Sequence, residues 1–452
     1  MTDARIDPTT LPPAVSDLAA RLRSAGGRAW VVGGPVRDLL LGVSPRDWDL
    51  ATDLPPDAVL AVVPEADGRD RRYGSCRVPS PTGVVTVTTL RRDIGCADGR
   101  HPDRVDFVRE PAIDALRRDF TVNALYLDPE QGRLFDPVGG LADLEARVLR
   151  TVGEPAQRFH EDALRLLRAI RFAGRFALQL EAATAAALRS AAATVRALSP
   201  ERQFAELTDA FTGPGRGRAL RLFVASGLAA VLLPEVAAMD GVSQPPEYHP
   251  EGDVLTHVCL VLDQVPAGDE VLSWAAVLHD VGKPPTWRLA EDRIRFDGHD
   301  TLSARMADEV LRRLHASTFL REQVADICLQ HIRFAALPGM RQAKAERWLR
   351  EPTFAKHLAF HRADCLGSHG DLSIHDFAVR ALAALPPLAA PLLHGQDVLD
   401  LGVRPGPEVG RLLRAVQARV DEAPAPLARP DALLLLREMV EQSRQEPGAS
   451  AR

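Results

Sequence analysis

A change of pattern near residue 140 constrains the fold of this chain more than any other feature. Upstream of it, alternating and β-rich runs predict strands over residues 28–32, 83–89 and 122–127, with a helix over 36–41. Downstream, nearly everything as far as residue 440 has helical periodicity broken by proline and glycine. We therefore expect an α+β head followed by all-α regions.

The 452 residues leave room for about three domains. Breaks rich in proline and glycine, such as residues 213–215 and 243–250, mark candidate boundaries. The sequence predicts four successive parts: a head over residues 1–145, a helical neck and body over 146–245, a second helical domain over 246–390, and C-terminal helices with a tail over 391–452.

Arginine is distributed unevenly along the chain. The formal net charge of −6 argues against wholesale adhesion to nucleic acid or an anionic membrane, so any polyanion must be held by a local patch. Residues 147–221 contain 13 arginines against 7 acidic residues, a local charge of +6. This stretch is a candidate polyphosphate-binding surface, although a solvated amphipathic face explains the charge equally well.

The sequence favours a cytoplasmic protein. Its five cysteines lack paired or metal-finger spacing, which argues against a disulfide scaffold and fits a reducing compartment. Residues 1–13 are polar and contain proline, unlike a signal peptide, and no stretch approaches the roughly 20 apolar residues that a membrane helix needs. We therefore expect no membrane partner.

Two adjacent glycines, Gly33 and Gly34, separate the first predicted strand from the helix over 36–41. Bare glycines let a phosphate approach backbone N–H groups at a helix N-terminus, where the helix dipole favours an anion. Arg37, in the first turn, can add a charge-assisted hydrogen bond. Gly34 and Arg37 are therefore candidate phosphate-binding residues, although most Gly-Gly pairs are only turns.

Asp47 and Asp49 form an Asp-Trp-Asp segment downstream of this glycine turn. In an extended segment both carboxylates point to the same side, because side-chain direction alternates with a period of two. Such a pair is costly unless a cation bridges it, and these hard oxygen ligands suit Mg²⁺, which completes its shell with nucleotide phosphates. Bound Mg²⁺ could activate a 3′-hydroxyl and steady a leaving pyrophosphate. An acidic surface turn explains most Asp-x-Asp segments, but the neighbouring glycine turn favours a catalytic pair.

Several ordered motifs carry a resemblance to a known family. They are Gly33–Asp38, Arg46–Leu50, Arg117–Ala124, Asp136–Gly140, Glu161–Arg165 and Ser199–Leu207. Over about residues 28–235 the chain closely resembles the class II tRNA nucleotidyltransferases, the bacterial CCA-adding enzymes and their poly(A) polymerase relatives. The resemblance implies an α+β fold with a polymerase-β-like nucleotidyltransferase head, an all-α neck and a body that carries tRNA.

Acidic and basic residues recur at positions 162, 165, 168 and 171, a spacing that predicts one face of a helix. Asp162 can accept from the exocyclic amine of cytosine or adenine, while Arg165 donates to the ring nitrogen beside it. Guanine and uracil present an acceptor where Asp162 also accepts, so this pair would reject them. Arg168, Arg171 and Arg118 are candidates to neutralise triphosphate charge. The alternative for this face is a salt-bridged surface helix.

The family loop bears on the kind of nucleotide addition, and one departure from the family pattern bears on the activity of the head. The segment 92–99 has the ordinary length of a family loop that the resemblance links to addition of the terminal A. The family usually has a third acidic residue in the strand before Leu90, and this chain has Thr86 there. A hydroxyl supplies no charge. If Asp47 and Asp49 alone suffice for catalysis, the head keeps its activity with weaker metal binding; if they do not, its activity is impaired.

A second group of potential metal ligands lies in the C-terminal half. The group contains His257, His279, Asp280, His299, His331 and Asp364, with Lys283 after the His-Asp pair. Imidazoles and carboxylates on successive helices can converge on a dinuclear centre, with Asp280 bridging the ions and Lys283 stabilising developing charge. These residues resemble the HD phosphohydrolase superfamily and imply an all-α HD domain that holds a divalent transition metal (Ni, Mn, Fe or Co). We expect phosphatase or 2′,3′-cyclic phosphodiesterase activity.

The leading hypothesis is an enzyme that adds or repairs the 3′-terminal CCA of tRNA from CTP and ATP without a nucleic-acid template, using Mg²⁺. One alternative is an enzyme of the same chemistry that adds only A, or poly(A). The other is an HD phosphohydrolase whose transferase head has decayed into an RNA-binding clamp, with Thr86 as the first sign.

Overall fold

The computed structural model describes residues 5–81, 83–95, 103–291, 293–385, 392–423 and 427–445. The chain forms two compact units, each described separately below. The first unit contains Met1–Leu329 with Gly367–His369, and the second contains Gln330–Leu366 with Gly370–Arg452. The boundary between the units therefore falls inside the predicted 246–390 region, and the four-part division stays a proposal.

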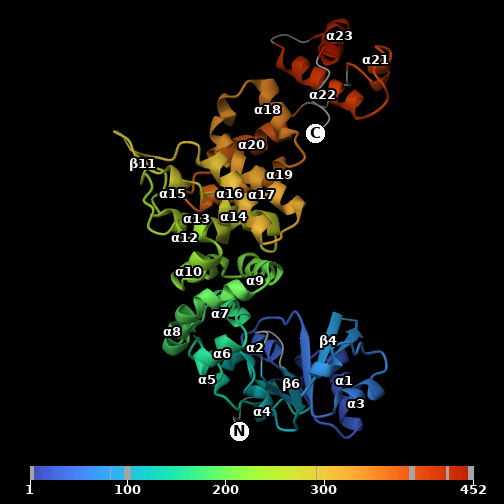
Figure 1. Cartoon of the computed structure of the whole chain (residues 1–452), viewed down its shortest axis with the longest axis vertical. Coiled ribbons are helices and arrows are strands. Elements are labelled where there is room, and N and C mark those ends of the chain that lie inside the picture. Colours follow the sequence, from blue (N-terminus) through green and yellow to red (C-terminus); the bar gives the residue numbers. More distant parts are fainter. Residues whose placement is uncertain are drawn as a thin grey trace. The chain divides into compact units, whose positions relative to one another are not determined.

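A six-stranded sheet organises the head at the start of the first unit (Figure 1). Its strand order is β3-β4-β2-β1-β7-β8, with β2 and β4 parallel and the other neighbours antiparallel. The strands are β1 (Ala29–Val32), β2 (Trp48–Thr52), β3 (Ser75–Ser80), β4 (Gly83–Thr89), β7 (Tyr126–Leu127) and β8 (Leu134–Phe135). The strands predicted over 28–32 and 83–89 and the helix predicted over 36–41, here α2 (Gly34–Leu40), are confirmed.

The strand predicted over 122–127 is only partly present. Residues Thr121–Asn123 form the short 3₁₀ helix η3, and only Tyr126–Leu127 pair as β7. The Thr121 hydroxyl donates to Asp143 at 2.6 Å, and Asn123 accepts from Arg37, so polar contacts hold the turn. The whole segment is buried, and a short buried apolar run cannot be assigned to strand or helix by periodicity alone.

The two faces of the sheet pack against different clusters. Val31 and Leu50 belong to a core that includes residues of α1 (Pro13–Ser24) and α3 (Pro56–Val62), whereas their neighbours Val32 and Ala51 belong to a second cluster with Tyr126. Successive side chains on a strand point to opposite faces. Asp49 therefore shares the face of Ala51, opposite the face that α1 covers.

A two-stranded hairpin of β5 (Arg91–Ile94) and β6 (Arg104–Phe107) follows β4. The predicted family loop at 92–99 begins within this hairpin, and its residues 96–99 lie outside the described residues.

Helices α6 (Pro155–Glu161), α7 (Leu164–Arg175), α8 (Ala182–Ala191), α9 (Pro200–Thr212) and α10 (Arg216–Ala225) follow the head, in green shades in Figure 1. Helix α7 packs against both α9 and α10. A Cβ on Gly174 would lie 2.6 Å from the Ala219 Cβ, so only glycine lets α7 and α10 approach this closely. The hydrophobic face of α7 is buried in this contact, which is why an amphipathic sequence forms a stable helix here.

The neck joins the following helices through buried polar contacts. The Arg216 guanidinium, 7% exposed, donates to the carbonyls of Leu262, Asp263 and Val265 at the C-terminal end of α13 (Val254–Gln264). Trp274, in α14 (Glu270–Leu278), donates its indole N–H to the Thr208 hydroxyl of α9 at 3.0 Å. The three Arg216 bonds satisfy carbonyls at the end of α13 that would otherwise lack a partner.

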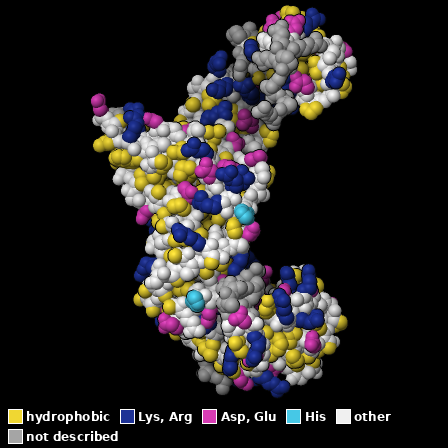
Figure 2. All heavy atoms as spheres, viewed as in Figure 1, with side chains coloured by type: hydrophobic (Ala, Val, Ile, Leu, Met, Phe, Trp, Pro, Cys, Tyr) yellow, Lys and Arg dark blue, Asp and Glu magenta, His cyan; other side chains and the backbone are white. Residues whose placement is uncertain are grey.

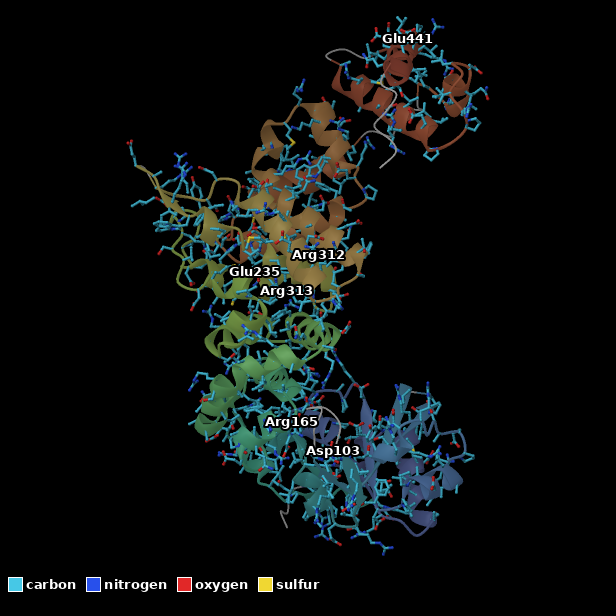
Figure 3. The ribbon with its side chains drawn as sticks, in the orientation of Figure 1. Asp103, Arg165, Glu235, Arg312, Arg313 and Glu441 are labelled. Carbon is cyan, nitrogen blue, oxygen red and sulfur yellow. The ribbon has the colours of Figure 1, made fainter. Side chains whose placement is uncertain are left out.

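An ion pair between Arg313 and Glu235, with a nitrogen–oxygen distance of 2.9 Å, joins α16 (His299–Arg313) to α12 (Pro234–Ala237) (Figure 3).

On the face shown in Figure 2, basic and acidic side chains are interspersed rather than gathered in one patch. Across the described residues, none of the helices combines the length and apolar character that crossing a bilayer demands. The four described cysteines are buried.

The second unit is helical. Helices η5 (His331–Gly339), α18 (Gln342–Leu349), α19 (Phe354–Leu366) and α20 (Ser373–Ala383) surround a core with Phe334, Trp348 and Phe354. Helices α21 (Gly395–Leu399), α22 (Pro407–Glu422) and α23 (Arg429–Gln445) enclose a separate core around Leu412 and Leu436. The helices predicted beyond residue 390 are therefore present and have a core of their own.

Candidate functional sites

The glycine turn lies between β1 and α2. Gly33 has φ 74°, in the left-handed region that favours glycine, and a Cβ there would lie 2.9 Å from Nη1 of Arg118. Both the backbone angle and the close approach therefore require glycine. Gly34 opens α2, and the nearest side-chain atom to its own virtual Cβ is Nη2 of Arg37, 3.7 Å away.

Arg37, predicted to reach a phosphate, is 4% exposed. Its guanidinium pairs with Asp38, donates to the side-chain oxygen of Asn123 and lies 4.2 Å from the ring centroid of Phe176, at the end of α7. These contacts give Arg37 a structural role in holding the head against α7. Its contact with phosphate stays a prediction.

Asp49 and Asp47 lie at the start of β2. Asp49 is half-buried within the strand, and Asp47, just before it, is exposed. Burial raises the pKa of Asp49, and the charge of Asp47 raises it further, while Arg118 and a hydrogen bond with Thr86 lower it. The two carboxylates are thus near enough to repel, and a divalent cation would relieve that repulsion. The donor set fits Mg²⁺.

Arg118 is held beside the glycine turn by Asp114 and Tyr126. Asp114 is 1% exposed; it receives the Tyr126 hydroxyl at 2.7 Å and the Arg118 side chain at 3.3 Å. Burial alone would raise the pKa of Asp114, but Arg117 and Arg118 outweigh it and lower that pKa to about 2. The Arg118 cation therefore lies beside the Gly33 turn, paired with Asp114, and its contact with nucleotide phosphates stays a prediction.

The helix predicted to carry positions 162 to 171 on one face is interrupted, and this expectation was wrong for its first member. Helix α6 ends at Glu161 and α7 begins at Leu164, with Asp162 in extended conformation (φ −152°, ψ 106°) between them. The Asp162 Oδ1 accepts from the Leu164 N–H at 3.0 Å. Aspartate favours such capping bonds over helix interiors, which is why the chain breaks here.

The three arginines of α7 that were predicted to bind nucleotide have partners from several elements. Arg165 (labelled in Figure 3) donates through Nη1 to Glu161 and the Arg158 carbonyl, and through Nη2 to the Arg117 carbonyl. Arg168 pairs with Asp119 at 2.8 Å, and Arg171 pairs with Glu206. The salt-bridged alternative therefore describes the contacts of this face, and the Arg168–Asp119 pair also fixes the head to the neck.

Arg202 was missed as a site residue. Its Nη2 lies 3.4 Å from the Asp162 Oδ1, so it helps to orient the carboxylate that was predicted to read the base. It belongs to the Ser199–Leu207 motif, and that motif was the signal that could have identified it.

The candidate HD centre brings together four of the predicted ligands in the first unit. His257 lies on α13, His279 and Asp280 follow α14, and His299 begins α16. The first three are at most 1% exposed. The Nε2 atoms of the three histidines surround the Asp280 carboxylate. His279 Nε2 lies 3.2 Å and His257 Nε2 3.6 Å from Asp280 Oδ2, and His299 Nε2 lies 3.7 Å from Asp280 Oδ1.

The other ring nitrogen of each histidine lies near an oxygen atom. The Nδ1 of His257 lies 2.8 Å from Glu251, that of His279 lies 2.9 Å from the Ala276 carbonyl, and that of His299 lies 2.8 Å from the Phe296 carbonyl. Oxygen atoms beside Nδ1 are the usual outer partners of histidines that bind a metal through Nε2.

The Nε2 atoms of His257 and His279 are 3.2 Å apart. Imidazole nitrogens gathered around a carboxylate are a typical ligand set for a divalent metal ion. Burial alone would raise the pKa of Asp280, but the charges of His279 and Lys283 hold it well below its usual range. The donor set therefore fits a divalent metal ion.

Three further residues of this site were not predicted: Gln244, His249 and Glu251. Two of them contact the predicted Lys283, whose Nζ lies 2.7 Å from Gln244 Oε1 and 3.5 Å from His249 Nε2, as well as 2.8 Å from Asp280 Oδ2. His249, Glu251 and His257 form a group whose potential ligand atoms all lie within 4.8 Å of one another. Burial, and then Lys283, lowers the pKa of His249 to about 4. His249 and Glu251 lie within eight positions of His257 in the sequence, and this proximity was the available signal for them.

His331 and Asp364 lie in the second unit. His331, 7% exposed, begins η5, and Asp364 is half-buried on α19. Their membership of the HD centre stays a prediction from the sequence.

Three regions of the chain match described domains. Residues 29–150 match the poly(A) polymerase head domain, residues 177–239 match the probable RNA- and SrmB-binding site of polymerase A, and residues 253–364 match the HD domain. Fold, sites and these matches define a nucleotidyltransferase head followed by an RNA-binding region and an HD domain.

Curated relatives identify the family. The chain is 40% identical over 212 residues to the CCA-adding enzyme of Geobacillus thermodenitrificans, covering 47% of this chain and about half, 52%, of that relative. It is 34% identical over 286 residues to the CCA-adding enzyme of Bacillus licheniformis (62% and 68%). It is 35% identical over 415 residues to the A-adding tRNA nucleotidyltransferase of Deinococcus radiodurans, covering 86% of this chain and 90% of that one. The chain therefore belongs to the tRNA nucleotidyltransferase family of CCA-adding and A-adding enzymes.

Solved structures agree. The CCA-adding enzyme of Bacillus stearothermophilus in complex with CTP has a TM-score of 0.68 and 25% identity, over 96% of this chain and all of that one. The Thermotoga maritima CCA-adding enzyme complexed with tRNA has a TM-score of 0.59 and 17% identity, over 96% and 97% of the two chains. At 17% identity, the similarity to the Thermotoga maritima enzyme shows a shared fold and nothing more.

Proposed function

We propose that this protein adds or repairs the 3′-terminal CCA of tRNA, using CTP and ATP and no nucleic-acid template. The observation that carries the proposal is the arrangement of Asp49, the Gly33 turn and Arg118 around one point of the head, with α7 fixed to that head through Arg168. The relatives named CCA-adding enzymes support it.

The chain's own residues would divide the work. Asp47 and Asp49 would hold Mg²⁺, which when bound supplies Lewis-acid activation of the primer hydroxyl and of the leaving pyrophosphate. Arg118 would hold triphosphate charge beside the glycine turn, with Arg168 and Arg171 as further candidates. Positioning of hydroxyl and phosphate by such groups is the main source of rate enhancement in phosphoryl transfer.

Asp162 and Arg165 would select the base. Asp162 Oδ1 is occupied by Leu164 and Arg202, while Oδ2 has no hydrogen bond within the described part of the chain. The described contacts of Arg165 use Nη1 and one N–H of Nη2, which leaves Nε–H and the other Nη2–H. An acceptor and a donor edge are thus available for the amine and ring nitrogen of cytosine or adenine.

A-only addition is the second candidate. The Deinococcus A-adding relative aligns over 415 residues, nearly the whole chain. The CCA-adding relative is more similar where it matches, at 40% identity over 212 residues against 35% over 415, and we therefore keep CCA addition as the first proposal.

Labelled nucleotides distinguish these functions. Purified protein is incubated with tRNA lacking CCA and with tRNA ending in CC, supplying CTP and ATP separately and together. Incorporation of both C and A supports CCA addition, and A on the CC-ended tRNA alone supports A addition. The Asp49→Asn variant is the control. Incorporation of neither nucleotide by the unmodified protein contradicts the transferase proposal and favours a decayed head.

We further propose that the protein acts in the cytoplasm. We also propose that the HD centre is a metal-dependent phosphatase or 2′,3′-cyclic phosphodiesterase that removes damaged 3′ ends. His257, His279, Asp280 and His299 would hold a divalent transition metal, which when bound activates water. His331 and Asp364 are proposed to complete the ligand set, and Lys283 to stabilise charge on the ester.

Replacing His279 and Asp280 together by alanine should abolish cleavage of a 2′,3′-cyclic nucleotide and leave nucleotide addition unchanged. Loss of both activities in a folded variant contradicts the two-site proposal.

A further inference from the structure

A closed loop before α13 supplies a buried amide to the HD centre. The loop ends are joined by the Gly241 N–H, which donates to Asp253 at 2.6 Å, and by a β-bridge between Ser243 and Asp253. Gln244 follows this closure and is 4% exposed. Its position is therefore set by the backbone of the loop.

The orientation of the Gln244 amide is fixed by its neighbour. The Lys283 ammonium, which can only donate, lies 2.7 Å from Oε1. The oxygen must face the lysine, so the amide nitrogen points away from it. This assignment follows from donor and acceptor chemistry rather than from the appearance of the two atoms.

The Gln244 Nε2 is a buried donor with no hydrogen-bond partner within the described residues. Leaving such a donor unsatisfied costs free energy, and native structures rarely tolerate it without a ligand or water. The same Lys283 ammonium lies 2.8 Å from the Asp280 carboxylate, so the amide is one contact removed from the metal ligands. Because Nε2 and Oε1 share one carbon atom, an acceptor bound beside Lys283 can reach this donor.

We propose that the Gln244 Nε2 is a substrate-binding donor that binds a non-bridging oxygen of the phosphate at the HD centre. The inference rests on the proposed phosphohydrolase function and adds a residue to it. The ligand class is a tetrahedral phosphate oxyanion, because the amide nitrogen donates only and the adjoining Lys283 is cationic. The competing explanation is that Gln244 serves only to hold Lys283.

The Gln244→Glu variant separates these two explanations. A carboxylate accepts from Lys283 at least as well as an amide, so the lysine stays in place. It has no donor for a phosphate, and its charge repels one. Gln244→Met, which removes both functions at similar volume, and Ser243→Ala, which alters neither, are the matched controls.

Inorganic phosphate is titrated calorimetrically into the full-length protein loaded with Mn²⁺, alongside its metal content and melting temperature. We expect Gln244→Glu to weaken phosphate binding at least ~10-fold at unchanged metal content and melting temperature. Hydrolysis of a 2′,3′-cyclic nucleotide should show the same loss in kcat/KM, with Ser243→Ala equal to the unmodified protein.

Two results overturn the proposal: no phosphate binding by the unmodified protein, or unchanged binding by Gln244→Glu. Failure of the phosphohydrolase function gives a different result, in which the protein binds phosphate through Gln244 without hydrolysing the ester. In that case the proposal stands while the hydrolase function falls.

Discussion

Thr86 lies directly opposite Asp49 in the parallel pairing of β2 and β4, and the two side chains share a hydrogen bond that lowers the pKa of the carboxyl group. The position where the family usually has a third acidic residue therefore contacts the proposed catalytic carboxylate itself. The hydroxyl contributes no charge, but it favours the ionised form of Asp49. Thr86 thus acts as a partner of the proposed metal ligand.

Replacing Thr86 by valine should raise the Asp49 pKa. The substitution keeps the β-branched shape and removes the hydroxyl that stabilises the charged form. We expect the acid limb of the pH–rate profile for nucleotide addition to move to higher pH and the Mg²⁺ requirement to rise. Steady-state rates at graded pH and Mg²⁺ measure both effects. An unchanged acid limb would show that Thr86 does not influence Asp49.

Replacing Asp162 by asparagine should relax base selection. The amide retains an oxygen that can cap α7 but can present a donor to the base, so the rejection of guanine and uracil weakens. Discrimination against UTP and GTP is expected to fall about 10-fold or more. Single-nucleotide incorporation assays on tRNA lacking CCA provide the measurement. Glu154→Gln, at an exposed residue just before α6, is the control, and unchanged discrimination in the Asp162 variant would remove Asp162 from the base-reading role.

Replacing Glu251 by glutamine should weaken metal binding at the HD centre. Glu251 lies 2.8 Å from the His257 Nδ1 and 2.9 Å from the His249 Nδ1, so its charge is an outer partner of the ring that is proposed to bind the metal. Loss of such an outer partner typically costs about 10–100-fold in metal affinity. Metal content after graded dialysis against a chelator tests this, and equal retention by both proteins would refute it.

Replacing Arg216 by methionine should destabilise the joint between α10 and α13. The buried guanidinium donates to three carbonyls, and methionine leaves these acceptors without it while retaining similar bulk. We expect a loss of about 3 kcal/mol in the free energy of unfolding, measured by chemical denaturation. Arg218→Met, in the same helix, is the comparison. A loss no greater than that of Arg218→Met would contradict a special role for Arg216.

Asp119 should contribute pH-dependent stability. Burial alone would raise its pKa, but Arg168 and Asn123 outweigh burial and lower it to about 2, from an ordinary 3.8. A lowered carboxyl pKa stabilises the fold above the unfolded-state pKa, and the contribution disappears as the pH falls through the folded-state pKa. The difference corresponds to about 2 kcal/mol.

The Asp119→Asn variant should therefore be less stable at pH 6, and the gap to the unmodified protein should narrow as the pH falls from 5 to 3. Denaturation midpoints across this range test the sign. A gap that widened toward acid pH would show that the Asp119 pKa is not lowered.

Much of the local structure could be predicted because it depends on neighbouring residues. The alternation in 83–89 and the glycine turn before α2 specified a strand and a strand-to-helix turn by local rules. The break at Asp162 was missed, although a capping aspartate is also a local signal, because the regular spacing of charges up to position 171 concealed it.

Contacts between distant residues were beyond such rules. Arg37 was expected to face a phosphate, but it pairs with Asn123, 86 residues away, in a buried contact. Gln244 belongs to no metal-ligand pattern, and its orientation depends on Lys283, 39 residues further along the chain.

The sequence by itself determined which residue types were available: paired aspartates after a glycine turn, an arginine-rich helix and a His-Asp pair with further histidines. Spacing along the chain encodes faces of strands and helices, so these chemistries could be identified without coordinates. Only the tertiary structure decided which of these side chains face a ligand and which are consumed by internal pairing. Burial and hydrogen bonding depend on which distant segments pack together, and the spacing of residues along the sequence does not specify that packing.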